Sequence, residues 1–84
     1  MIEGKLVTKY VVGGPEGYVI NAGFGKVEWG PAAHDALWFG HAWEGTKAAV
    51  ASALRLGLDN FYIAEVKLRY HDMKIYPLAV ERVY

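Results

Sequence analysis

The stretch TKAAVASALRLGLDNFYIAEV, residues 46–66, constrains the fold more than any other part of the chain. Thr46 suits the N-cap of a helix, and the apolar residues that follow recur at spacings of one, three and four, which places them in one stripe. Gly57 stands where a left-handed residue commonly ends a helix. The stretch therefore predicts a helix through Leu56, beginning at Thr46 or as early as Ala42, followed by a turn and a strand.

Alternating or β-branched residues predict strands on both sides of this helix. Residues 61–70, FYIAEVKLRY, alternate strictly between apolar and polar positions, as a strand with one buried face does. GGPEG at 13–17 interrupts the first apolar run and predicts a hairpin with a five-residue connection. Pro77 restricts the last strand to an edge or a bend, because proline cannot donate to a ladder. The expected strands are residues 5–12, 18–22, 26–29, 61–70 and 74–84.

These elements predict a single α+β domain over residues 1–84, in the order β-β-(β)-α-β-β. The economical arrangement is an antiparallel sheet of 4–5 strands with one main helix packed on one face, and the alanines of TKAAVASAL let that helix approach the sheet closely. Pro31 can open a short helical turn, and ALWF at 36–39 fits either a buried turn or a brief strand. Without cysteine, no disulfide or thiolate site supplements the small core.

The charge balance and the hydropathy argue against two classes of partner. Nine basic and nine acidic residues give a net charge of zero, whereas nucleic-acid binders generally carry a basic excess. No apolar run is long enough to span a bilayer, and MIEGKLVTKY lacks the basic start and apolar centre of a signal peptide. The sequence predicts a cytoplasmic protein that does not bind a membrane, and its charge argues against nucleic acid as a partner.

No arrangement of residues matches a catalytic motif. A small metal-dependent enzyme is one alternative, with candidate ligands His34, His41, His71 and Asp72. Against it, neighbouring residues of a strand point to opposite faces, and zinc-type spacing is absent. Ser52 has no nucleophile elbow around it, and the glycine-rich loops lack the residues that cradle phosphates. We therefore expect no enzyme activity, no catalytic residue, no metal and no cofactor.

The aromatic residues are the strongest candidates for a binding surface. Trp and Tyr are preferred anchors of protein interfaces, and glycine-rich loops can present them. Roughly half of these residues are expected in the core instead. The candidate binding residues are Tyr18, Phe24, Trp29, Trp38, Trp43 and Arg69. The alternative is an aromatic pocket for a small nucleotide-type ligand, with Arg55 or Arg69 meeting a phosphate.

Five motifs follow one another between residues 6 and 68: GYVINAG, KVEW, DALWF, TKAAVASALRLGL and FYIAEV. In this order they resemble a group of small phage and prophage accessory proteins, in which a hairpin and a Trp-containing strand precede an alanine-rich helix and another strand. The resemblance implies a binding role, since members with known roles bind and block host factors as anti-CRISPR or other anti-defence inhibitors. We therefore expect a phage-type inhibitor of a host defence protein, with sequestration of a nucleotide-type signal as the alternative.

Apolar residues make up 54% of the chain, which is a surplus for 84 residues. A dense core or a self-association surface would accommodate that surplus. The strand-like ends of the chain each offer an edge with unpaired N–H and C=O groups, and few charges guard KIYPLAVERVY at 74–84. We expect a homodimer, formed through a sheet edge or through the sheet face without the helix.

Overall fold

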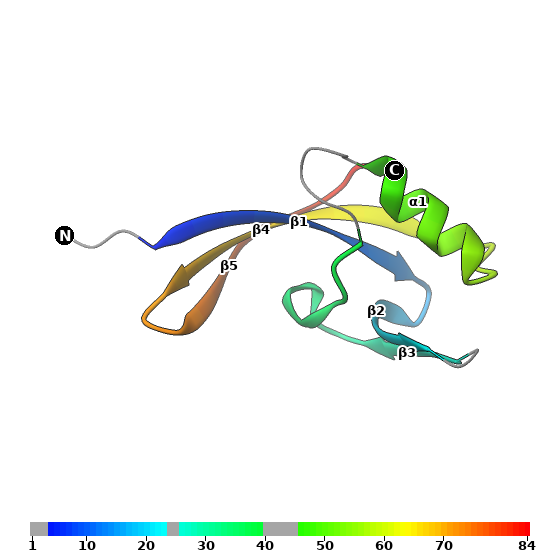
Figure 1. Ribbon diagram of the computed structural model, residues 1–84, viewed down its shortest axis with the longest axis horizontal. Coiled ribbons are helices and arrows are strands. Elements are labelled where there is room, and N and C mark those ends of the chain that lie inside the picture. The colour runs from blue at the N-terminus through cyan, green and yellow to red at the C-terminus, as the bar shows by residue number, and fades with distance from the viewer. Residues whose placement is uncertain (1–3, 24–25, 40–45) are drawn as a thin grey trace.

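The computed structural model describes residues 4–23, 26–39 and 46–84 (Figure 1). Its strands form one antiparallel sheet in the order β3-β2-β1-β4-β5, with one helix on one face, so the predicted α+β class is confirmed. The elements are β1 (Lys5–Gly14), β2 (Gly17–Gly23), β3 (Lys26–Gly30), the 3-10 turn η1 (Ala33–Asp35), α1 (Thr46–Arg55), β4 (Tyr62–His71) and β5 (Lys74–Arg82).

The first hairpin is tighter than the sequence predicts. The connection between β1 and β2 is Pro15-Glu16, two residues rather than five, because the flanking glycines belong to the strands. Gly17 has a φ of 126°, a conformation that only glycine adopts readily. A Cβ at Gly13 would collide with the ring of Tyr62 on β4, so this glycine serves close packing rather than a loop.

An extended segment lies between the first two strands. β1 and β2 pair at only two positions next to their turn, and beyond them residues 37–39 join the strands. The N–H of Leu37 donates to the carbonyl of Val19 at 2.9 Å, and the N–H of Phe39 donates to the carbonyl of Tyr10 at 2.8 Å. ALWF is thus neither of the two predicted alternatives: residues 37–39 are an extended segment that is not a regular strand, and its backbone bonds to both neighbouring strands.

The sheet carries a core on each face. On the helix face, the buried residues are Tyr10, Val12, Val19, Ala49, Ala53 and Ile63. On the opposite face, called here the η1 face, they are Val11, Ala33, Ala36, Ala64, Val66 and Leu68. Ala49 and Ala53 have no exposed surface, and their spacing of four residues makes them one stripe of α1 against the sheet. The face without the helix is thus covered in its middle by η1, and is not a free surface over its whole length.

A Schellman motif ends the helix as the sequence predicts. The N–H of Leu58 donates to the carbonyl of Ala53 at 3.2 Å, and the N–H of Gly57 donates to the carbonyl of Leu54 at 3.0 Å. Gly57 has the left-handed φ of 78° that this motif requires. The helix ends at Arg55, one residue before the predicted end, and the suggested start near Ala42 lies outside the described residues.

A buried lysine on β1 fixes η1 against the sheet. Lys9 is only 8% exposed, and its Nζ donates to the carbonyl of Ala36 at 2.8 Å and to that of His34 at 3.0 Å. Burial lowers the pKa of Lys9, and the nearby carboxylate of Asp35 partly opposes this shift. The ammonium group therefore acts as a clamp on the carbonyls that precede the extended segment 37–39.

Candidate binding surface

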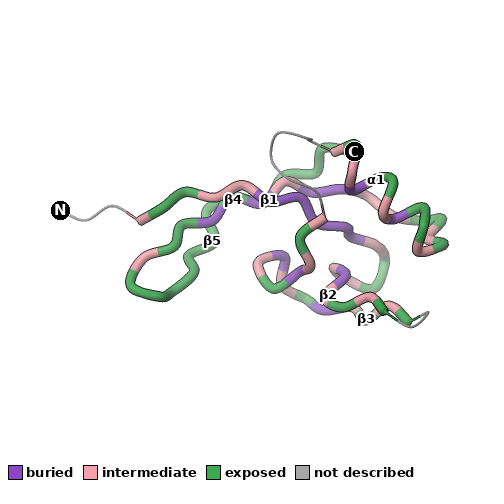
Figure 2. Tube along the Cα trace, viewed as in Figure 1, coloured by how far each residue is buried: buried purple, intermediate pink, exposed green. Residues whose placement is uncertain are grey.

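The end of the sheet farthest from α1 is a three-stranded blade. We define the distal blade as residues 5–6 of β1, 69–71 of β4 and 74–76 of β5, with the turn Asp72-Met73. The molecule measures 46 × 23 × 21 Å, and the blade forms one end of its long axis (Figure 1). The buried residues concentrate in the middle of the molecule (Figure 2), so the blade extends beyond the core.

The register of the strands sets the two faces of the blade. Leu6 pairs with Arg69, which pairs with Tyr76 across β4 and β5, so these three side chains form one row on the helix face. The adjacent row, on the η1 face, is Lys5, Tyr70 and Ile75. Each row therefore combines two apolar or aromatic side chains with one cation.

The apolar side chains of the blade are exposed on both faces. Their exposed fractions are 63% for Leu6, 39% for Tyr70, 103% for Met73, 43% for Ile75 and 44% for Tyr76. Scattered apolar residues are normal on a protein surface, but a continuous group on one projecting element is typical of an interaction site. Neither α1 nor η1 extends over the blade (Figure 1).

The turn at the tip holds a methionine in a conformation that favours glycine. Asp72 and Met73 have φ values of 52° and 61°, and they form the two-residue loop between His71 and Lys74. Such loops prefer Asn-Gly or Asp-Gly, because both central residues need a positive φ. The fully exposed Met73 gains nothing from burial within the chain that would offset this backbone cost. A contact with another molecule would explain why an apolar side chain is placed there.

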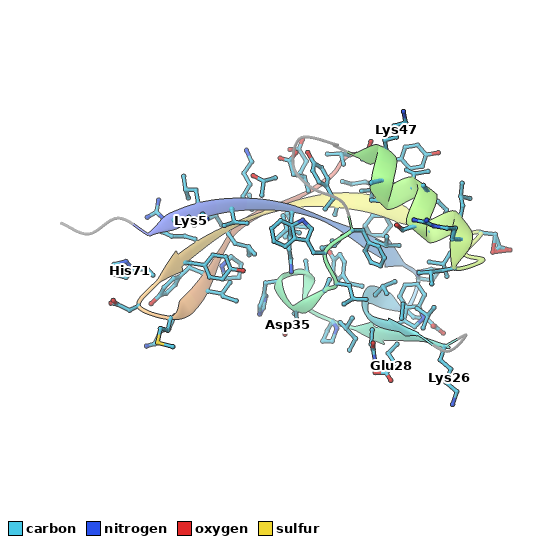
Figure 3. All side chains as sticks on the ribbon, in the orientation of Figure 1. Lys5, Lys26, Glu28, Asp35, Lys47 and His71 are labelled. Carbon is cyan, nitrogen blue, oxygen red and sulfur yellow. The ribbon has the colours of Figure 1, made fainter. Side chains whose placement is uncertain are left out.

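The charge of the blade is positive. It carries three basic side chains, Lys5, Arg69 and Lys74, against the single acid Asp72, which gives +2 with His71 neutral. Lys5 and His71 lie together at this end of the molecule, far from Lys47 on α1 (Figure 3). His71 Nε2 lies 3.2 Å from Asp72 Oδ2, so this carboxylate contacts its neighbour on the same turn. Since the whole chain is neutral, the remainder carries −2.

The predicted binding residues do not form one surface. Tyr18 meets Tyr62 edge-to-face with ring centroids 6.3 Å apart, and Trp29 packs against the helix-face core. Trp38 is 52% exposed, while Arg69 is exposed on the blade. Phe24 and Trp43 lie outside the described residues.

Sequence reasoning missed the apolar members of the blade. The available signal was the pair of apolar positions on each side of the HDM turn, Tyr70 before it and Ile75-Tyr76 after it. In a hairpin with a two-residue loop, such positions place apolar side chains on both faces.

The described residues give little support for metal binding by the two His-Asp pairs. His34 Nε2 lies 3.7 Å from Asp35 Oδ2, and no group of three or more metal-binding side chains gathers within residues 4–23, 26–39 and 46–84. His41 lies outside them. A hollow of about 440 Å³ lies on the β2–β3 hairpin, and its lining residues are Asn21, Ala22, Gly23, Lys26 and Glu28. Neither Arg55 nor Arg69 lines this hollow, so it lacks the arginine expected of a nucleotide pocket.

The part of the chain that the structure describes contains no helix of the length and apolarity needed to cross a membrane. No protein-family model matches the chain, and neither a curated protein nor a solved structure matches it.

Proposed function

We propose that this protein is a non-enzymatic binding module of the cytoplasm whose distal blade docks on another protein. The observation that carries the proposal is the exposure of Leu6, Tyr70, Met73, Ile75 and Tyr76 together on the projecting distal blade. Tyr and Arg dominate the energetics of protein interfaces, and the helix-face row supplies both beside a leucine. A thin blade with two apolar faces suits insertion between surfaces of a protein better than enclosure of a small molecule.

The charge of the blade indicates the chemistry of the partner surface. An apolar cleft with an acidic rim would complement the +2 of the blade, and the −2 on the rest of the chain would orient the approach. Steering of this kind raises the association rate and weakens as salt is added. The partner is therefore expected to bind more slowly at high ionic strength while the apolar contacts persist.

Inhibition is the role that this mode of binding supports. A small chain without a catalytic motif acts on a larger protein by occupying a site that the larger protein uses. The order of motifs between residues 6 and 68 resembles that of small phage accessory proteins, of which those with known roles block host factors. We therefore propose a phage-type inhibitor, with a host defence protein as its target.

A comparison of two double variants tests the role of the blade. Arg69→Ala/Tyr76→Ala removes the centre and one end of the helix-face row. Leu54→Ala/Arg55→Ala makes a closely matched change on the exposed outer side of α1, where Leu54 is 62% exposed. The wild type and both variants are immobilised, and the proteins captured from bacterial lysate are quantified by mass spectrometry.

We expect at least one host protein to be retained by the wild type and by the α1 variant but lost from the blade variant. With that protein purified, the loss of two hot-spot side chains should raise Kd by a factor of about 30 or more. Equal capture by all three chains would contradict the proposal, as would turnover of nucleotides or esters by the isolated protein.

A further inference from the structure

The outer edge of β5 presents a row of backbone groups to solvent. The N–H of Val83 donates to the carbonyl of Ile63 at 2.9 Å, so Val83 faces β4. Because successive residues of a strand face alternately to either side, Glu81 also faces β4, while Val80 and Arg82 direct their N–H and C=O groups away from the sheet. β5 is the last strand of the sheet, and among the described residues no strand pairs with its outer side.

This edge has few of the features that normally prevent pairing with another strand. The run Ile75–Val80 contains no charged residue, and Leu78 and Val80 are 51% and 48% exposed. Pro77 lies opposite Leu68 at an irregularity of the ladder and divides β5 into a blade half and a body half. The body half, residues 78–82, contains no proline, and its three apolar residues Leu78, Ala79 and Val80 precede Glu81 and Arg82.

The exposed area of the chain is larger than that of a compact monomer of the same mass. The accessible surface is 5829 Å², whereas a compact monomer of 9.3 kDa exposes about 5,000 Å². The excess of roughly 800 Å², to which the projecting distal blade contributes, is of the order of the area that each partner contributes to an interface of standard size. A second copy of the chain would supply an edge of the same length and the same sequence.

We infer that two copies of this protein pair antiparallel through residues 78–82 of β5, with a two-fold axis at Val80. In this register Val80 lies opposite the partner's Val80, and the two residues exchange both backbone hydrogen bonds. Arg82 lies opposite the partner's Leu78, and Glu81 lies opposite the partner's Ala79. The product is one continuous sheet formed from the five strands of each copy.

The charges and the proline select this register. An axis at Glu81 would place two glutamates directly opposite each other, which destabilises a strand pair. With the axis at Val80, no two like charges face each other, and the pairing ends at Pro77, which has no N–H to offer.

The pairing has a consequence for the proposed binding role. Because the two β5 strands run in opposite directions, the two distal blades lie at opposite ends of the joined sheet. The dimer would then present two binding elements, and a target with two sites would be held more tightly than by either blade alone. The pairing itself rests on β5 and does not require that the blade bind a host protein.

A single cysteine provides a direct test, because the chain has none of its own. Opposite residues of a hydrogen-bonded antiparallel pair have Cα atoms about 5.5 Å apart, which lies within the range of a disulfide. Under an added mild oxidant, Val80→Cys should form a covalent dimer within minutes, and Leu54→Cys, on exposed α1, should not. Equal crosslinking of both variants, or none at Val80→Cys, would overturn the inference.

Charge substitutions at the same position test the two-fold axis in the unmodified backbone. Light scattering at tens of micromolar should give twice the chain mass of 9.3 kDa for the wild type and for Leu54→Lys. Val80→Lys and Val80→Glu should each be monomeric, and an equimolar mixture of the two should restore the dimer. A monomeric wild type would overturn the pairing, as would a dimer that survives either substitution.

The result is separable from the test of the blade. If the wild type is monomeric but Arg69→Ala/Tyr76→Ala still abolishes capture of a host protein, the proposed function stands and the pairing through β5 is wrong. If the wild type is dimeric but no host protein depends on the blade, the pairing stands and the proposed function is wrong. Circular dichroism of each variant confirms that the sheet is intact before either conclusion is drawn.

Discussion

Lys9 shows how one side chain can determine the path of a distant segment. Its stem crosses the η1 face of β1, and its ammonium group reaches two carbonyls that lie 25 and 27 residues further along the chain. The carbonyls of His34 and Ala36 need a donor because η1 has too few residues to bond them within itself. The position of η1 therefore depends on a lysine that the strand places in the core.

Replacement of Lys9 by methionine should loosen this arrangement. Met keeps the apolar stem but leaves two carbonyls without a donor, at a cost of about 1–3 kcal/mol for each group that stays buried, partly offset because an ammonium is no longer desolvated. We expect a net loss of about 1–2 kcal/mol of unfolding free energy at pH 7, and faster hydrogen exchange of the Leu37 and Phe39 amides. Urea unfolding and exchange measured by NMR check both effects.

Lys67→Met is the control for this substitution. Lys67 is an exposed residue of β4 whose Nζ lies 3.9 Å from a Glu65 carboxylate oxygen, a distance typical of a weak surface ion pair. The control should change the free energy of unfolding by less than about 0.5 kcal/mol. If both variants leave the two amides equally protected, Lys9 does not clamp η1.

Two tyrosines should make the fold sensitive to alkaline pH. Burial raises the pKa of Tyr10, and the hydrogen bond from its hydroxyl to Glu65 Oε2 at 3.1 Å raises it further. Burial likewise raises the pKa of Tyr62. The folded state holds these two protons more tightly than the unfolded state does, and this difference stabilises the fold. The stabilisation is complete below the ordinary pKa of 10.0 and is lost as pH rises through the folded pKa values.

Tyr10→Phe isolates the contribution of one of these groups. Below pH 9 the variant should be less stable than the wild type by about 1 kcal/mol, the usual value of one hydrogen bond. Above pH 10.0 this difference should shrink, because only the wild type must keep Tyr10 protonated. The lowered pKa of Lys9 has the opposite effect, because it makes the folded state more stable as pH approaches 10.5. Lys9 is present in both proteins, so its contribution cancels when the two are compared. Unfolding curves that keep a constant separation from pH 8 to 11.5 would contradict this assignment.

At the scale of elements, Met73 at the tip of the β4–β5 hairpin lowers the stability of the turn. Met73→Gly should raise the free energy of unfolding by about 0.5–1 kcal/mol, because glycine adopts the φ of 61° without a steric cost. The same substitution removes the most exposed apolar side chain of the blade, so it should also weaken capture of the blade-dependent partner.

The two effects of Met73→Gly are measured separately, by urea unfolding and by binding to the purified partner. Met73→Asn serves as the comparison, since asparagine tolerates a positive φ and also removes the apolar tip. Both variants should lose affinity to a similar extent. A more stable protein with unchanged affinity would show that the tip of the blade does not enter the interface.

At the scale of the whole molecule, stability should depend on protein concentration. If two chains pair through β5, each tenfold rise in concentration stabilises the dimer against two unfolded chains by about 1.4 kcal/mol. The midpoint of urea unfolding for the wild type should therefore rise between low and high micromolar concentrations. Val80→Lys should unfold at one midpoint throughout, and a concentration-independent wild type would argue against the pairing.

The sequence alone determined the elements whose rules are local. The helix end at Gly57-Leu58 follows from backbone hydrogen bonds within one turn, and the strict alternation of β4 follows from the period of a strand. These signals involve residues a few positions apart, so they can be identified without knowing which distant segments pack together. Together they were sufficient for the α+β class, while Pro77 restricted the last strand to an edge or a bend, and β5 is the edge strand.

The tertiary structure decided how far the covering elements reach. In β4, Ala64, Val66 and Leu68 share a face with Tyr70, yet the first three are buried and Tyr70 is 39% exposed. All four residues occupy equivalent alternating positions in β4. Their exposure differs because η1 covers the middle of that face and ends before the blade. Likewise Tyr18 and Trp29 pack inward while Arg69 stays exposed, because burial depends on which distant segment lies above each residue. Which segment covers which residue is set by contacts across the whole chain. The residue pattern of a single strand does not contain this information.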